Sequence, residues 1–185
     1  MEKIPQQRAL NGLKIVLFGP ESTGKSTLAQ QLATHFNTVK VDEYARDYLQ
    51  DKFDATGKVC EYHDLMSIAI GQRIAENEAV EKANKHLFCD TDALETFIYS
   101  IVYFNKAPLE LEEEARQSKY DLYLLLHVDT PWTPDDLRDK PEDRNEMFQM
   151  FEKGLKEFNK PYTIISGLGE KRFENALKAI QKISN

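Results

Sequence analysis

Short apolar runs alternate with longer segments of helical periodicity along this chain. The apolar runs have the length and composition of buried strands, and the last helical segment repeats Phe173, Ala176, Leu177 and Ile180 along one face. The predicted strands cover residues 14–19, 38–41, 86–90, 122–129 and 162–166; the predicted helices cover residues 26–36, a short stretch from 43, 61–85, 93–105, 109–118, 145–158 and 172–183.

Strands that alternate with helices in this way predict right-handed crossovers and a parallel sheet. We therefore expect an α/β protein of three layers, with a five-stranded parallel sheet covered by helices on both faces. A chain of 185 residues is long enough to form one such domain with its own core, over residues 1–185. Ligands of parallel sheets bind beyond the carboxyl ends of the strands, so the chemistry should follow directly after them.

Composition narrows the class of protein. The net charge of −7, without a block of clustered Lys and Arg, argues against nucleic acid as a partner. The chain has no apolar stretch of the roughly 18 residues that a membrane span needs, and its polar start has no signal-peptide core. Cys60 and Cys89 lack metal-ligand spacing, which fits idle thiols in a reducing cytoplasm.

The first strand runs into the sequence GPESTGKST, which has the spacing of a Walker A loop. Gly19 and Gly24 allow the tight turn that points backbone N–H groups at phosphate oxygens. Lys25 is expected on the β- and γ-phosphates of ATP, and the Ser26 hydroxyl on Mg²⁺. The remaining loop residues expected at the nucleotide are Glu21, Ser22, Thr23 and Thr27. Glu21 is unusual beside phosphates, and we expect it to face a second substrate or the flank of the loop.

Carboxylates follow the next two predicted strands. Of Asp42 and Glu43, one is expected to accept a proton from an attacking hydroxyl, and the other to cap a helix or orient its neighbour. Asp90 ends an apolar strand in the Walker B manner, so Asp90 or Asp92 should serve Mg²⁺ while the other holds substrate hydroxyls. Tyr44 and Arg46, in the segment after Glu43, are candidate contacts of the second substrate.

Three further features suggest substrate contacts. Trp132, on a proline-bounded turn, suits stacking on an aromatic or cationic ring; the alternative is an aromatic side chain that packs the loop against the sheet. Residues 132–146 are expected to form a short lid whose Arg138 and Arg144 approach the phosphates; the alternative is a solvated loop with local ion pairs. Gln72 is a polar group on an inward helix face, and its partner is a substrate or a protein carbonyl.

These motifs together resemble a known family. The segments 19–27 (GPESTGKST), 41–48 (VDEYARDY), 89–96 (CDTDALET) and 120–138 resemble the ribosylnicotinamide kinase domain of NadR-type proteins, over nearly the whole chain from residue 14. The resemblance implies a P-loop kinase fold similar to nucleoside and nucleotide kinases. It also implies transfer of phosphate from MgATP to the ribose 5′-hydroxyl of nicotinamide riboside, with Trp132 near the nicotinamide ring and Asp90 and Asp92 serving the metal and the ribose.

Other functions are compatible with the same phosphate loop and differ in the molecule that accepts the phosphate. Another nucleoside, a nucleotide or a cofactor precursor is the nearest alternative acceptor, and Arg46 with Arg73 would suit one that already carries a phosphate. A nucleotide-dependent switch is less favoured. Because few residues precede the first strand, we expect neither adenylyl transfer nor DNA binding. The sequence leaves monomer and homodimer open.

Overall fold

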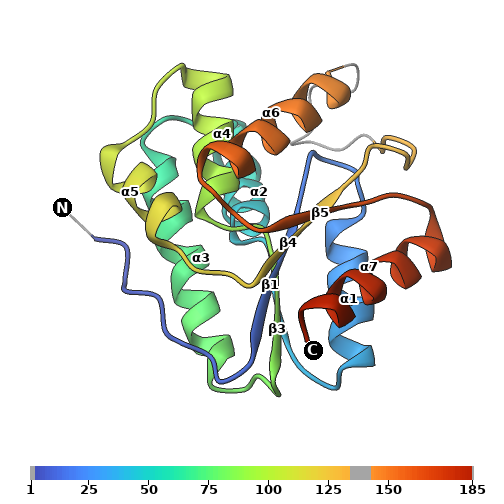
Figure 1. Cartoon of the computed structure of the whole chain (residues 1–185). Helices are drawn as coiled ribbons and strands as arrows, with labels where there is room; N and C mark the ends of the chain where they lie inside the picture. The colour runs from blue at the N-terminus through green and yellow to red at the C-terminus, as the bar shows by residue number, and fades with distance from the viewer. Residues whose placement is uncertain (1–2, 134–142, 185) are drawn as a thin grey trace.

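Five parallel strands form the centre of the structure, in the order β2-β3-β1-β4-β5 (Figure 1). The structure is a computed structural model and describes residues 3–133 and 143–184. The strands are β1 (Leu13–Phe18), β2 (Lys40–Val41), β3 (His86–Asp90), β4 (Leu122–Leu126) and β5 (Tyr162–Ile165).

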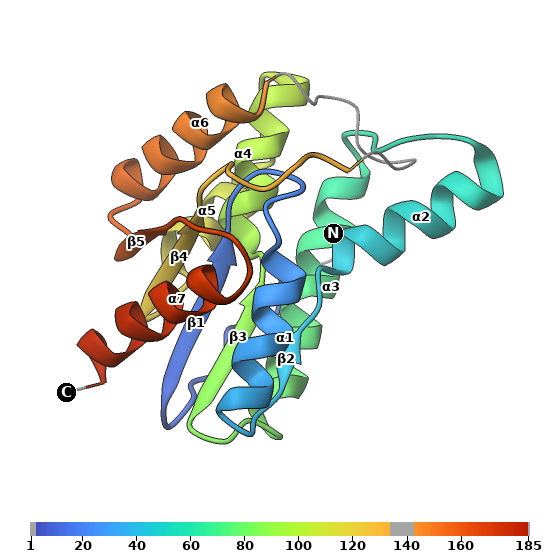
Figure 2. The same ribbon diagram turned by 90° about the vertical axis from the view of Figure 1, so that its right-hand side faces the viewer.

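Helices cover both faces of this sheet (Figures 1 and 2). One face packs on α1 (Lys25–His35) and α7 (Gly169–Ile183). The other packs on α3 (Asp64–Val80), α4 (Ala93–Phe104), α5 (Leu109–Gln117) and α6 (Arg144–Glu157). The expected three-layer α/β fold is confirmed.

The strands are apolar throughout because both faces are covered. In β1, Ile15 and Leu17 belong to the core under α1 and α7, while Val16 and Phe18 belong to the core under the other helices. This alternation sets the register that brings the carboxyl ends of β1 and β3 side by side, with Leu17 opposite Asp90.

The helix α2 (Tyr44–Thr56) is longer than the short helix expected there. None of its residues is buried, so it lacks the apolar stripe by which a helix is recognised in sequence. The helix α2 lies outside the two helical layers that cover the sheet, and it packs against α3 (Figure 2). Gly57 ends it in the left-handed conformation, with φ of 68°.

Other boundaries differ by a few residues. β4 ends at Leu126, three residues before its expected end, and the polar stretch that follows turns out of the sheet. The expected helix over 61–85 forms as α3 from Asp64 to Val80. Within the described residues, no helix has both the length and the apolarity needed to cross a bilayer.

Candidate active site

The loop between β1 and α1 has the backbone conformation that its glycines predict. Gly19 has φ of 138° and Gly24 has φ of 84°, both in the region that favours glycine. A Cβ on Gly19 would lie 3.0 Å from the carbonyl oxygen of Leu126, so the loop also needs glycine to pass close to β4. Thr23 Oγ1 donates to the Pro20 carbonyl at 2.8 Å and stiffens the turn. Gly24 occupies the N-cap position, so the open N-terminus of α1 faces the loop.

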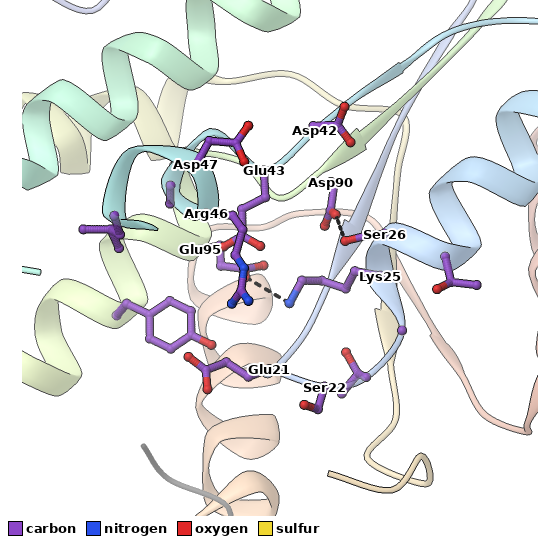
Figure 3. Close-up of a pocket in the computed structure, with 16 residues that line it drawn as sticks. Glu21, Ser22, Lys25, Ser26, Asp42, Glu43, Arg46, Asp47, Asp90 and Glu95 are labelled. Carbon is purple, nitrogen blue, oxygen red and sulfur yellow. Dashed lines mark hydrogen bonds and ion pairs between the residues drawn. The ribbon is translucent and has the colours of Figure 1, made fainter. Parts of the chain in front are cut away.

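Lys25 is buried at the centre of the site. Its Nζ donates to the carbonyl oxygens of Gly19, at 2.7 Å, and Pro20, at 3.2 Å. It also lies 3.3 Å from Glu95 Oε1 (Figure 3). Burial alone would lower the pKa of Lys25, but the negative charges of Glu95, Glu43 and Asp90 raise it above the usual lysine value. The ammonium therefore stays charged, held by groups that a phosphate is able to replace.

Ser26 and Asp90 lie close together at the carboxyl ends of β1 and β3. The Ser26 hydroxyl donates to Asp90 Oδ2 (Figure 3). The other oxygen, Asp90 Oδ1, is buried and has no hydrogen-bond partner among the described residues. Burial raises the pKa of Asp90. A hydroxyl and a carboxylate with a spare buried oxygen are the donor set that a hard cation requires.

The two carboxylates after β2 lie in different surroundings. The Asp42 side chain is 70% exposed and forms an ion pair with Lys40. Glu43 is half-buried, lines two adjoining cavities, and its charge acts on Lys25. The idea that Asp42 caps the following helix is wrong, since α2 begins at Tyr44 with Glu43 at the N-cap position. Of this pair, Glu43 is the carboxylate that faces the loop.

Glu95 is the site residue that sequence analysis missed. It lies in the first turn of α4, three residues after Asp92, so it fits the pattern of a capping box. Instead its side chain turns to Lys25, only 4% exposed, and burial raises its pKa well above the usual value. One signal was available: Glu95 is the only charged residue in α4, a helix of mostly apolar and aromatic residues.

Two cavities meet at this point. The first, of about 520 Å³, is lined by every residue from 21 to 27 together with Asp90, Arg46 and the carboxylates after β2. The second, of about 230 Å³, is mostly apolar and is walled by α3 and α4 side chains that include Leu65, Ile68 and Tyr103. Six residues line both cavities: Glu21, Glu43, Ala45, Leu49, Glu95 and Tyr99. We call them the donor cavity and the acceptor cavity.

Three expected substrate contacts lie outside both cavities. Asp92 is 1% exposed, caps α4 by accepting from Glu95 N at 3.3 Å, and accepts from the Tyr123 hydroxyl at 2.6 Å. Gln72 donates to the carbonyls of Asp42 and Asp90, so protein carbonyls rather than a substrate satisfy its amide. The Tyr44 ring covers Gly71, where a Cβ would lie 2.2 Å from a ring carbon. None of the three lines either cavity, and Tyr44 is 37% exposed. Their expected contact with the second substrate stays a prediction.

The expected lid lies largely outside the described residues, and Arg138 is among them. Trp132 is described, and it lines neither the donor nor the acceptor cavity. Arg144 begins α6 and donates to the backbone carbonyls of Thr130, at 2.8 Å, and Ser22, at 2.9 Å. It therefore contacts the phosphate loop through the Ser22 carbonyl.

A second arginine contacts the same loop. Arg172, in α7, is 4% exposed and donates to the carbonyl oxygens of Thr23, Gly167 and His127. It also pairs with Asp129. Together, Arg144 and Arg172 bond to the carbonyls of two consecutive loop residues, Ser22 and Thr23, and so hold the loop in place.

Arg73 does not join Arg46 as a phosphate-binding pair. It is 3% exposed on α3 and is paired with Glu76 and Glu114, with Ser118 as a further acceptor at 2.7 Å. Arg46 instead lines the donor cavity. The expected pair for an acceptor that already carries a phosphate is therefore not formed.

Comparison with known proteins identifies the family. Residues 14–172 match the model of a family described as AAA domain. The chain belongs to this family. This AAA-domain protein is also 34% identical over 150 residues to the "Trifunctional NAD biosynthesis/regulator protein NadR" of Escherichia coli (strain K12). That match covers 78% of this chain and 37% of the relative, so the chain spans well under half of the relative's length. The resemblance to NadR-type proteins is confirmed.

Solved structures extend this likeness to three dimensions. A crystal structure of NadR protein in complex with NR superimposes with a TM-score of 0.79 at 25% identity, covering 94% of this chain and 52% of that one. A deoxyadenosine kinase from M. mycoides matches with a TM-score of 0.68 at 15% identity, covering 92% of this chain and 100% of that one. The latter likeness shows that the fold is shared with a nucleoside kinase.

Proposed function

We propose that this chain is an ATP-dependent kinase that phosphorylates the ribose 5′-hydroxyl of nicotinamide riboside. The observation that carries the proposal is the junction of the donor cavity with the acceptor cavity. A phosphate loop that opens into a small, mostly apolar cavity has room for a second substrate beside the γ-phosphate. The similarity to a NadR protein solved with NR supports the choice of nicotinamide riboside.

The donor cavity fits the triphosphate of ATP. Backbone N–H groups of the loop and the N-terminus of α1 supply positive potential for the phosphates. Lys25, already charged, would exchange its bonds to Gly19 O and Pro20 O for phosphate oxygens. This exchange neutralises part of the charge that spreads over the transferred group.

Ser26 and Asp90 fit the Mg²⁺ that accompanies ATP. The unpartnered Asp90 Oδ1 and the Ser26 hydroxyl are oxygen donors at the edge of the donor cavity. When bound there, Mg²⁺ supplies positive charge to the β- and γ-phosphate oxygens.

Glu43 is suited to take the proton of the attacking hydroxyl. In the transfer, the ribose 5′-oxygen forms a bond to the γ-phosphorus, and the bond between that phosphorus and the β,γ-bridging oxygen breaks, releasing ADP. The hydroxyl proton passes to the Glu43 carboxylate, which lines both cavities. The exposed Asp42, paired with Lys40, serves the orientation of the segment after β2.

Residues 132–146 are proposed to close over the site as a lid. Closure would exclude water, which competes with the riboside as acceptor. Trp132 would then come to the nicotinamide ring and Arg138 to the phosphates. Trp132→Ala should raise the KM for the riboside far more than that for ATP, whereas equal effects on both would indicate a packing role.

A panel of acceptors tests the function. Purified protein with MgATP is given nicotinamide riboside, deoxyadenosine, thymidine or buffer, and ADP release and the phosphorylated product are measured. We expect nicotinamide mononucleotide from the first alone, and no turnover by Lys25→Ala. Turnover of a deoxynucleoside without nicotinamide riboside would overturn the choice of acceptor, and acceptor-independent hydrolysis would indicate a switch ATPase.

A further inference from the structure

The phosphate loop of this chain carries a carboxylate among groups that bind anions. Glu21 lies between Gly19 and Lys25, and its negative charge opposes phosphate binding. In the structure it is half-buried and lines both the donor and the acceptor cavity. Its charge also acts on Tyr99, whose ring lies in the wall of the acceptor cavity. Glu21 therefore lines the cavity in which a second substrate would fit, which agrees with one of the two orientations that the sequence suggested.

Negative charge dominates the whole site. The donor cavity is lined by six carboxylates and only two cations, Lys25 and Arg46. Figure 3 shows the Lys25 and Arg46 side chains reaching into the space beside Glu21 and Glu95. The triphosphate itself is repelled by this excess. The Mg²⁺ proposed at Ser26 and Asp90 would balance part of it. Glu21, Glu43 and Glu95 also line the acceptor cavity, where a second species with positive charge would balance the rest.

The acceptor cavity offers the matching surroundings for a flat organic cation. Its walls include the rings of Tyr99, Tyr103 and Phe104, and aromatic faces attract cations. Glu95 contributes a second, independent feature: its Oε2 atom is buried and accepts no hydrogen bond from the part of the chain that the structure describes. The side chain is only 4% exposed. A buried carboxylate oxygen of this kind is costly unless a ligand satisfies it.

We propose that the acceptor cavity selects ribosides whose base carries a positive charge, and that Glu21 is the residue that sets this selectivity. Glu21 would pair with the charged ring from the phosphate-loop side, while the aromatic walls contact its faces. The inference rests on the proposed function, since the pyridinium of nicotinamide riboside is such a base. It goes further in predicting that the charge of the ring, more than its shape, decides which riboside is phosphorylated.

Benzamide riboside isolates the charge, because it has the shape of nicotinamide riboside and a neutral ring. With wild-type protein we expect kcat/KM to favour nicotinamide riboside by about tenfold or more, the ratio that a desolvated cation–π and ion-pair contact supports. Glu21→Gln, which keeps the size of the side chain, should reduce that preference about fivefold or more through the KM for nicotinamide riboside. The KM for ATP should stay level or fall.

Glu113→Gln on the exposed surface of α5 is the matched control, since it removes one carboxylate away from both cavities. It should keep the wild-type preference. The same preference in wild type and Glu21→Gln would overturn the assignment. If Glu21→Gln does not fold, the wild type still decides: equal kcat/KM values for nicotinamide riboside and benzamide riboside would overturn the proposed charge selectivity.

A binding measurement separates this inference from the proposed function. The cation 1-methylnicotinamide and its neutral analogue 3-methylbenzamide are titrated into the protein with calorimetric or NMR detection. Preference for the cation in wild type, lost in Glu21→Gln, supports a cation-selective cavity even if no riboside is phosphorylated. Equal binding of both compounds by wild type contradicts the inference, even if nicotinamide riboside is the substrate.

Discussion

Lys25 Nζ lies 3.3 Å from Glu95 Oε1, and the two side chains are 8% and 4% exposed. The pair joins the phosphate loop to the first turn of α4, two segments about 70 residues apart in the chain. Removal of Glu95 takes away the carboxylate whose charge acts most strongly on the buried ammonium, which is unfavourable. The pair therefore fixes the position of the loop lysine before any nucleotide binds.

Glu95→Gln should lower kcat/KM by about tenfold to a hundredfold, since Lys25 loses the charge that holds its ammonium at the centre of the site. Steady-state ADP release measures the effect. Lys25→Met should lower kcat/KM much further than Glu95→Gln does, and the double variant should lose no more than Lys25→Met alone, because the two side chains act as one unit. Additive losses would show that Glu95 acts independently of the lysine.

Glu43→Gln and Asp42→Asn separate the two carboxylates after β2. We expect Glu43→Gln to lower kcat by about a hundredfold or more, the usual contribution of a positioned general base, with little change in the KM for ATP. Asp42→Asn should lower kcat by no more than about threefold, because an exposed ion pair contributes little. The opposite order of effects would assign the proton transfer to Asp42.

Arg172→Lys should loosen the phosphate loop. A lysine cannot reproduce the planar fork that reaches the Thr23, Gly167 and His127 carbonyls together. We expect a KM for ATP that is raised about fivefold or more and a melting temperature lowered by several degrees. The neighbouring Lys171→Gln, which alters an exposed ion pair with Glu174, is the control and should change neither quantity.

Asp92 should make stability depend on pH. Burial raises the pKa of Asp92 from 3.8 to about 6. Between these values the native protein binds more protons than the unfolded chain, so the contribution of Asp92 to the free energy of unfolding falls as pH rises, by up to about 3 kcal/mol. Asp92→Asn, which retains partners for Tyr123 and Glu95 N, removes this dependence.

Urea unfolding at several pH values between about 4 and about 7.5 tests the role of Asp92. Relative to wild type, Asp92→Asn should gain stability as pH rises through this range. A difference between the two proteins that stays constant with pH would show that Asp92 titrates normally. The catalytic assay is a separate readout, since Asp92 lies outside both cavities.

The sequence by itself determined the fold and the donor half of the site. Alternating strand and helix patterns specify a parallel sheet, because each pattern has only one way to bury its apolar face. GPESTGKST specifies a phosphate loop, because glycine conformations and a following helix are local properties. The apolar strand that ends at Asp90 likewise predicted a carboxylate at the carboxyl ends of the strands, where Asp90 meets Ser26.

Only the tertiary structure decided which of the other polar residues meet. Glu43 and Asp42 are adjacent in sequence, yet one faces Lys25 and the other faces solvent. Asp92 and Gln72 looked like substrate contacts and are satisfied within the protein, whereas Glu95 looked like a cap and pairs with Lys25. Such roles depend on the direction of each side chain and on partners far away in the chain, which no local pattern encodes.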